Sequence, residues 1–363
     1  MDESYTTKAM QSLEEKLLRF LRCFEKLQEE LHFAQITEAQ QRLQEAAVDI
    51  FPQVLSDLAA LTPPESRKTF HAKLSEAVTH LAESYQVFLS GKGRQFAEAF
   101  LQSRNLLCRG LYLLYDLRGE LPGLQEYWVL PEAAASLSKK EAQAAQSDVP
   151  VGFRQNPRTQ SRGEYSLYVP EYYSATQSWP LIVCLHGGYG RDDEYIWTWL
   201  RPAKSKGYLL LAPKSIGPTW SVLNPPLDTN SIRAMLEEVS AAYNVDRRRV
   251  YLSGLSDGGM FAYLLGLSCP EWFAGIAPIA GELNPMTDPL LRRKQGVEVP
   301  LFVVHGAKDF IFDVRSVRAS CELLKKIGYN ITYTELPDWG HAYTYSINEQ
   351  LVLPWFEGLQ RGV

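Results

Sequence analysis

The sequence contains few cysteines, and their spacing does not suggest a metal site or a set of disulfides. The five cysteines among 363 residues are scattered, odd in number and without a Cys-x-x-Cys pair: Cys23, Cys108, Cys184, Cys269 and Cys321. Structural zinc sites and disulfide-rich scaffolds use closely spaced or paired cysteines. We therefore expect neither of these, and no metal ion.

Long apolar runs and a strong excess of one charge are also lacking. No uninterrupted apolar stretch approaches the about 20 residues of a membrane-spanning helix, and residues 1–5 show neither the basic nor the apolar part of a signal peptide. Forty-two acidic and 37 basic residues give a net charge of -5, which offers no attraction to nucleic acid or an anionic membrane. We expect a cytoplasmic protein with no membrane span and no nucleic-acid partner.

Residues 1–130 have the apolar spacing of packed helices. The first helix carries an apolar residue every three or four positions: Met10, Leu13, Leu17, Phe20, Phe24, Leu27 and Leu31. A capping box at Thr37 and Gln40 predicts a second helix, kinked at Pro52, and two more helices follow. Such a pattern favours an antiparallel helical bundle. The bundle is expected to be a scaffold or a surface for homo-oligomers, and the alternative is a cap over an active site.

Residues 131–161 are expected to be a linker, and residues 162–363 a separate α/β domain. There, short apolar runs alternate with helical segments, which predicts a mostly parallel sheet with helices on both faces. The predicted strands are residues 164–170, 181–185, 208–212, 250–253, 275–280, 301–305 and 331–336. The predicted helices are residues 228–243, 258–267, 314–327 and 348–360.

Residues 250–262 have the pattern of a buried strand, a glycine turn bearing one serine, and a helix. This is the setting of a nucleophile elbow, in which Gly254 and Gly258 permit a very tight turn and Ser256 presents its hydroxyl to a cleft. A Gly-x-Ser-x-Gly pentapeptide alone is a weak signal, so the strand and helix around it matter. The pattern predicts that Ser256 is a nucleophile.

A nucleophilic serine needs a base and an acid that orients the base. The apolar run of residues 300–309 ends in Asp309, at the carboxyl end of a predicted buried strand. Residues 331–336 predict another strand, and the loop after it carries His341. Asp309 is therefore the predicted acid and His341 the predicted base.

Two further carboxylates and two further histidines lie near these motifs. Asp313 remains an alternative acid, whereas Asp338 is expected to be structural because it lies in the same loop as the base. His186 is expected to fix its loop by hydrogen bonds instead of acting as a base. His305 is interpreted in the same way.

A glycine-rich turn follows the apolar run of residues 180–185 and exposes backbone N–H groups. The N–H of Gly188 is expected to act with that of Asp257 in binding the negative oxygen of a tetrahedral intermediate. Tyr189 is the alternative donor.

Four segments together resemble the α/β-hydrolase superfamily: Leu185-His186-Gly187-Gly188, Gly254-Leu255-Ser256-Asp257-Gly258-Gly259, His305-Gly306 with Asp309, and Gly340-His341. The chain order of serine, acid and histidine is also the one expected there. Residues 162–361 are most similar to the phospholipase/carboxylesterase group, which includes acyl-protein thioesterases, and to the polyhydroxybutyrate-depolymerase and feruloyl-esterase-like group. Asp257 stands where the thioesterases usually carry glutamine, and the helical N-terminal region has no counterpart in those compact enzymes.

The resemblance implies a serine carboxylesterase that needs no cofactor and hydrolyses small-molecule acyl or aryl esters of small to medium size. Its triad would be Ser256, Asp309 and His341, and its oxyanion hole Gly188 with Asp257. Aromatic residues in neighbouring loops are expected to line the substrate pocket: Tyr189, Trp220, Trp339 and Tyr343. The alternatives are amide, peptide or thioester hydrolysis on the same triad, and a non-catalytic binding or assembly module.

Overall fold

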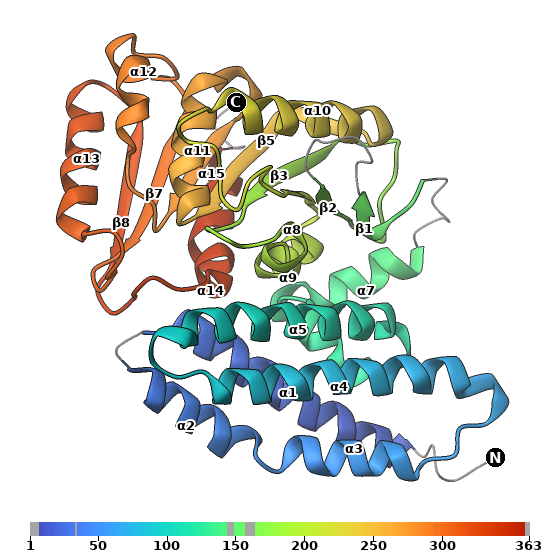
Figure 1. Ribbon diagram of the computed structural model, residues 1–363. Helices are drawn as coiled ribbons and strands as arrows, with labels where there is room; N and C mark the ends of the chain where they lie inside the picture. Colours follow the sequence, from blue (N-terminus) through green and yellow to red (C-terminus); the bar gives the residue numbers. More distant parts are fainter. Residues whose placement is uncertain (1–6, 33–34, 144–148, 157–163, 360–363) are drawn as a thin grey trace. The chain divides into compact units, whose positions relative to one another are not determined.

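The chain divides into two compact units, residues 1–129 and residues 130–363. The computed structural model describes residues 7–32, 35–143, 149–156 and 164–359 (Figure 1). Residues 1–5, and residues 144–148 and 157–161 of the predicted linker, lie outside the described residues.

The first unit is helical, as the apolar spacing predicted. Its helices are α1 (Thr7–Glu29), α2 (Ile36–Ala47), α3 (Ile50–Ala60), α4 (Lys68–Ser90), α5 (Phe96–Asp116) and α6 (Gln125–Trp128). Their apolar faces form a core rich in aromatic rings, for example the edge-on pairs of Phe20 with Phe51 and of Phe24 with Phe88. Helices α4 and α5 approach closely, and the hydroxyls of Ser84 and Ser103 each donate to the other residue's carbonyl at 2.8 Å.

The second predicted helix is two helices. Helix α2 ends before Val48 and α3 begins after Asp49, so the helix is interrupted shortly before Pro52, where only a kink was expected. The ring of a proline clashes with the carbonyl four residues earlier, here that of Val48. Pro52 therefore fits in the first turn of a new helix but not inside a continuous one.

The predicted capping box at Thr37 and Gln40 is wrong. Helix α2 begins at Ile36 without a side-chain cap. Gln40 instead donates its amide to the carbonyl oxygens of Phe88 at 2.9 Å and Gly91 at 2.7 Å, at the end of α4. A helix leaves its last carbonyls without intrahelical partners, and Gln40 satisfies two carbonyls at this end.

The second unit is built on a mostly parallel sheet with helices, as predicted. Its strand order is β1-β2-β4-β3-β5-β6-β7-β8, and only the pairs β1/β2 and β2/β4 are antiparallel. The strands are β1 (Gly152–Asn156), β2 (Tyr165–Val169), β3 (Trp179–Leu185), β4 (Leu209–Pro213), β5 (Val245–Leu255), β6 (Gly275–Ile279), β7 (Leu301–Gly306) and β8 (Ile331–Leu336).

The direction of chain progress reverses between β3 and β5. From β3 the chain moves outward to β4, then crosses back to β5 and continues in the other direction through β6, β7 and β8. In open α/β sheets, ligands bind at the carboxyl ends of the strands at such a switch point. The segments that directly follow β3 and β5 contain Gly188 and Ser256, so both lie at this switch point.

Helices cover both faces of the sheet. They are α8 (Asp192–Tyr195), α9 (Trp197–Lys206), α10 (Pro226–Ala242), α11 (Asp257–Ser268), α12 (Asp288–Arg292), α13 (Val314–Lys326), α14 (Tyr345–Ile347) and α15 (Leu353–Leu359). Side chains from α10, α11 and α13 share one buried cluster with Leu252 of β5. Tyr251, the preceding residue of β5, points to the opposite face of the sheet. There its ring stacks on Phe356 of α15. Phe356 also stacks on Trp199 of α9.

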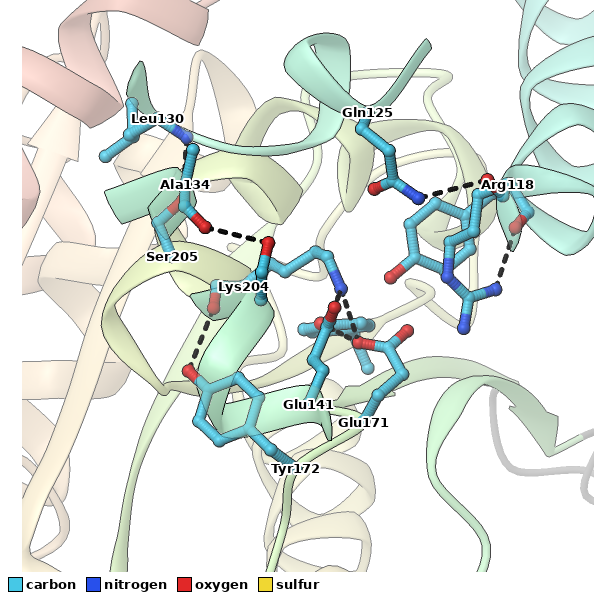
Figure 2. Close-up of polar contacts among 12 residues, drawn as sticks. Arg118, Gln125, Leu130, Ala134, Glu141, Glu171, Tyr172, Lys204 and Ser205 are labelled. Atoms are coloured by element: carbon cyan, nitrogen blue, oxygen red, sulfur yellow. Dashed lines mark hydrogen bonds and ion pairs between the residues drawn. The ribbon is translucent and has the colours of Figure 1, made fainter. Parts of the chain in front are cut away.

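The region predicted as a linker contains helix α7 (Ala134–Gln143) and strand β1. Figure 2 shows how this segment is joined to α9 within the second unit. Lys204 of α9 is buried and pairs with Glu141 of α7 and with Glu171, the latter at 2.8 Å. The Leu130 N–H donates to the Ser205 hydroxyl at 2.8 Å. No helix among the described residues is long and apolar enough to cross a bilayer.

Candidate active site

Ser256 lies on the tight turn between β5 and α11. Its backbone angles are φ 57° and ψ -121°, in a region that non-glycine residues rarely adopt. A Cβ on Gly254 would lie 2.2 Å from the carbonyl oxygen of Gly258, and one on Gly258 would lie 2.4 Å from that of Leu185. Glycine is therefore needed at both positions, and the turn lifts Ser256 to the carboxyl edge of the sheet.

The structure brings Ser256, His341 and Asp309 into one hydrogen-bonded series. His341 Nε2 lies 2.8 Å from Ser256 Oγ, and His341 Nδ1 lies 2.8 Å from Asp309 Oδ2. An ionised carboxylate can only accept, so Nδ1–H donates to Asp309 and Nε2 accepts from the serine hydroxyl. This is the tautomer in which the imidazole can take up the serine proton.

The Asp309 carboxylate is buried and fixed by further hydrogen bonds. Its Oδ1 accepts from the backbone N–H groups of Ile311 at 2.8 Å and Phe312 at 2.9 Å. Burial raises the pKa of Asp309, but the hydrogen bond from His341 and those from the two backbone N–H groups outweigh it, so the pKa lies below its ordinary value. Asp309 is therefore ionised at neutral pH and can stabilise a charged His341.

The two competing carboxylates have other partners. Asp313 accepts from the N–H of Arg315 at 2.9 Å and caps helix α13. Asp338 is exposed and pairs with Lys308 at 2.7 Å. Neither is the carboxylate bonded to His341.

The two other histidines form hydrogen bonds with backbone groups. His186 donates from Nδ1 to the carbonyl of Gly187 at 2.7 Å and accepts at Nε2 from the N–H of Ser215 at 3.1 Å. Burial lowers the pKa of His186 to about 4, so it remains neutral. His305 Nε2 lies 3.0 Å from the carbonyl of Phe312, and burial lowers its pKa as well.

Two backbone N–H groups flank Ser256. Asp257 is the first residue of α11, and the first N–H groups of a helix have no intrahelical partner. Within the described residues, the N–H groups of Gly188 and Asp257 have no hydrogen-bond acceptor. The alternative donor is corrected: the N–H of Tyr189 donates to the carbonyl of Pro218 at 2.9 Å and is therefore occupied.

Asp228 was not predicted from the sequence. It holds the loop of residues 214–225, between β4 and α10. This buried carboxylate in the first turn of α10 accepts from the N–H of Ile216 at 2.9 Å and from the N–H and hydroxyl of Ser221 at 2.8 and 2.6 Å. The same loop contacts residues 186–190, which include Gly188 and are called the oxyanion turn below. Ser215 donates its N–H to His186, and the carbonyl of Pro218 accepts from the N–H of Tyr189. An aspartate in a predicted first helical turn after a loop rich in glycine, proline and serine is the signal that was available.

The predicted pocket aromatics behave differently from one another. Trp220 is only 2% exposed, donates from Nε1 to the carbonyl of His186 at 2.7 Å and stacks on Phe261. It is a core residue that supports the oxyanion turn, so its prediction as a pocket wall is corrected. Tyr189 is exposed, while Trp339 and Tyr343 are half-buried in accessible loops.

Two rings near the imidazole were not predicted from the sequence. Phe310 and Phe312 lie 6.3 and 5.7 Å from the ring of His341, measured between ring centroids.

Among the residues that the structure describes, no group of His, Cys, Asp and Glu side chains is arranged to hold a metal ion.

Part of the second unit is similar to known proteins. Residues 228–351, which include Ser256, Asp309 and His341, match the Phospholipase/Carboxylesterase family. A bifunctional acetylxylan esterase/xylanase of Neocallimastix patriciarum is 32% identical over 143 residues, 38% of this chain and 20% of that protein. Feruloyl esterase B of Neurospora crassa is 30% identical over 125 residues, 31% of this chain and 42% of that protein.

Two further comparisons cover other groups of enzymes. Acyl-protein thioesterase 1 of Gibberella zeae is 30% identical over 97 residues, 26% of this chain and 41% of that protein. The chain thus spans less than half the length of each of these three curated relatives. The solved structure of an S-formylglutathione hydrolase from Staphylococcus aureus aligns with a TM-score of 0.48 at 15% identity, over 59% of this chain and 99% of that chain.

Proposed function

Because the second unit of the chain belongs to the α/β-hydrolase superfamily, we propose that the protein is a serine carboxylesterase that hydrolyses small to medium acyl or aryl esters. The observation that carries the proposal is the series of hydrogen bonds from Ser256 through His341 to Asp309, at the carboxyl edge of the sheet. The esterase names of the similar proteins support the same reaction class.

In the first half-reaction, the Ser256 hydroxyl attacks the ester carbonyl while His341 Nε2 takes its proton. Asp309 holds the ring in the required tautomer and stabilises the imidazolium. The N–H groups of Gly188 and Asp257 bind the negative oxygen that forms, and each such donor is worth about 10²- to 10³-fold in rate. The imidazolium then gives its proton to the leaving alcohol, and the acyl group remains on Ser256.

In the second half-reaction, water replaces the alcohol. His341 takes a proton from the water as it attacks the acyl-serine, and the same two N–H groups bind the second oxyanion. Collapse of this intermediate returns the proton to Ser256 and releases the carboxylic acid. The strained elbow keeps the serine hydroxyl in place for both steps.

Exposed apolar side chains support an apolar acyl or aryl group in the substrate. Large exposed apolar residues follow the carboxyl ends of four strands: Tyr189 after β3, Leu223 after β4, Met286 after β6, and Phe310 with Ile311 after β7. These ends share the edge of the sheet that carries Ser256. Exposed apolar residues at the edge of the sheet that carries a reactive serine favour a substrate with apolar surface.

Labelling with a fluorophosphonate tests whether Ser256 is the nucleophile. The wild-type protein is expected to be labelled and the S256A variant is not, because the probe traps an activated serine. Labelling of a folded S256A variant at the wild-type rate would assign the reaction to another residue. The variant Ser253→Ala, at a buried serine of β5, is the matched control and should remain reactive.

A substrate panel separates the proposed activity from the alternatives. It contains p-nitrophenyl esters of increasing acyl length, an aryl ester of an aromatic acid, an acyl thioester and a peptide amide. We expect the oxygen esters to give the highest kcat/KM. A higher value for the thioester or the amide would replace this proposal with one of those hydrolases.

A further inference from the structure

The side chain of Asp257 lies beside the candidate oxyanion hole. A Cβ built on Gly188 would lie only 2.5 Å from Asp257 Oδ2, so this carboxylate packs against the backbone of Gly188. Thr219 donates its hydroxyl to the same oxygen and fixes the orientation of the side chain. Asp257 therefore presents a negative charge next to one of the two N–H groups that would bind the substrate oxygen.

No basic side chain compensates this charge within the described residues. The half-buried Asp257 side chain is bonded to Thr219, and no described lysine or arginine lies within ion-pair distance of it. In the loops that directly follow β3, β4 and β7, each basic residue is paired elsewhere: Arg191 with Asp193, Lys214 with Glu164, and Lys308 with Asp338. Within these three loops, the basic side chains therefore do not offset the negative charge of Asp257.

We propose that Asp257 is a specificity-determining residue that makes the site reject esters whose acyl group carries a negative charge and accept neutral or cationic acyl groups. This inference rests on the proposed esterase function. The carbonyl oxygen that enters the oxyanion hole brings the adjoining acyl group close to Gly188, and so close to the Asp257 carboxylate. Two like charges a few ångströms apart in this partly screened setting repel enough to change the rate about tenfold.

The test uses three aryl esters with the same leaving group and acyl chains of equal length. The chains end in a carboxylate, a carboxamide or a trimethylammonium group. For the wild-type protein, kcat/KM for the anionic ester is expected to be about tenfold below that for the neutral ester, and the cationic ester to match or exceed the neutral one. In the D257N variant, which keeps an oxygen acceptor for Thr219, the three values should converge.

Asp338→Asn is the matched control. It removes the same formal charge from a loop at the same edge of the sheet, but its carboxylate is already paired with Lys308. The ratio of anionic to neutral ester should therefore be unchanged in this variant. A ratio that shifts equally in both variants would point to net charge in general and overturn the assignment to Asp257.

A measurement on the wild-type protein covers the case in which D257N fails to fold. Raising the salt concentration screens exposed charges, so the deficit of the anionic ester should shrink while kcat/KM for the neutral ester stays constant. If the wild type hydrolyses the anionic and neutral esters with equal kcat/KM, or if the difference between them persists in D257N, this inference is overturned. The esterase proposal then remains intact. Failure of the wild type to hydrolyse even the neutral ester overturns the esterase proposal itself.

Discussion

Ser256 Oγ lies 2.8 Å from His341 Nε2, although 85 positions separate the two residues in the chain. Strands β6 and β7 lie between the strands that lead to them. At about 4.8 Å per strand spacing, the loop after β8 must reach back roughly 14 Å. Its backbone passes directly over Gly306, where a Cβ would lie 2.3 Å from the carbonyl oxygen of Trp339.

Replacing Gly306 with alanine should therefore displace His341. The added methyl group meets backbone, which cannot move aside as a side chain can, so the loop that carries the imidazole must shift. We expect kcat to fall at least about tenfold, since misplacing a catalytic group by about 1 Å can cost about 10²-fold. Steady-state kinetics checks this, and Gly358→Ala, at a position with open space around it, should retain full activity.

Removing the charge of Asp309 should reduce turnover without unfolding the protein. In Asp309→Asn the side chain no longer enforces the tautomer in which His341 Nε2 is free to accept, and it no longer stabilises the imidazolium. We expect kcat to fall about 10³- to 10⁴-fold, measured with the best ester of the panel. The same change at Asp313 should have little effect, and comparable losses in both variants would contradict the assignment of the acid.

Asp192 should make stability depend on pH. Burial is the main cause that raises the pKa of this carboxyl to about 6, from an ordinary value of 3.8. The folded protein therefore holds the proton more tightly than the unfolded chain, and stability is lost as the pH rises from about 4 to above 6. The shift corresponds to about 3 kcal/mol at most.

The variant Asp192→Asn carries no charge to bury and can still accept from the hydroxyl of Ser166. It should be more stable than the wild type at pH 8 by about 1–3 kcal/mol and nearly equal at pH 4. Urea unfolding at the two pH values measures this difference. If the variant and the wild type differ in free energy of unfolding by the same amount at pH 4 and pH 8, burial of the charge is not the cause of the difference.

Lys204 should be important for the stability of the second unit. Its ammonium is 1% exposed and lies between Glu141 and Glu171. Lys204→Met leaves these carboxylates without their cation, and breaking such a buried pair costs about 3–5 kcal/mol. Lys206→Met in the same helix removes an exposed lysine and should change the free energy of unfolding by less than about 0.5 kcal/mol. Equal effects would show that the buried network contributes little.

The sequence predicted the central strands well because strands buried on both faces are nearly continuous apolar runs. It missed β1, whose residues Gly152–Asn156 include only one large apolar side chain and lie at the edge of the sheet. It also missed α9, which contains Pro202 and is buried on nearly all sides. A helix without a polar face has no amphipathic period to detect.

Some of the predicted site residues were recognisable from local sequence patterns, whereas the environment of Trp220 was not. Ser256, Asp309 and His341 each follow a recognisable strand, so short local patterns were enough to propose them. The environment of Trp220 depends on the carbonyl of His186, 34 positions away, and no local pattern distinguishes a buried tryptophan from one that faces a cleft.

The buried carboxylate of Asp228 has a wider consequence than its place in the chain suggests. It organises a loop that contains no reacting group, and that loop in turn supports the turn bearing Gly188. Ester turnover therefore reports on the integrity of this remote anchor, and damage there would resemble a defect in the chemistry although every reacting atom is still present.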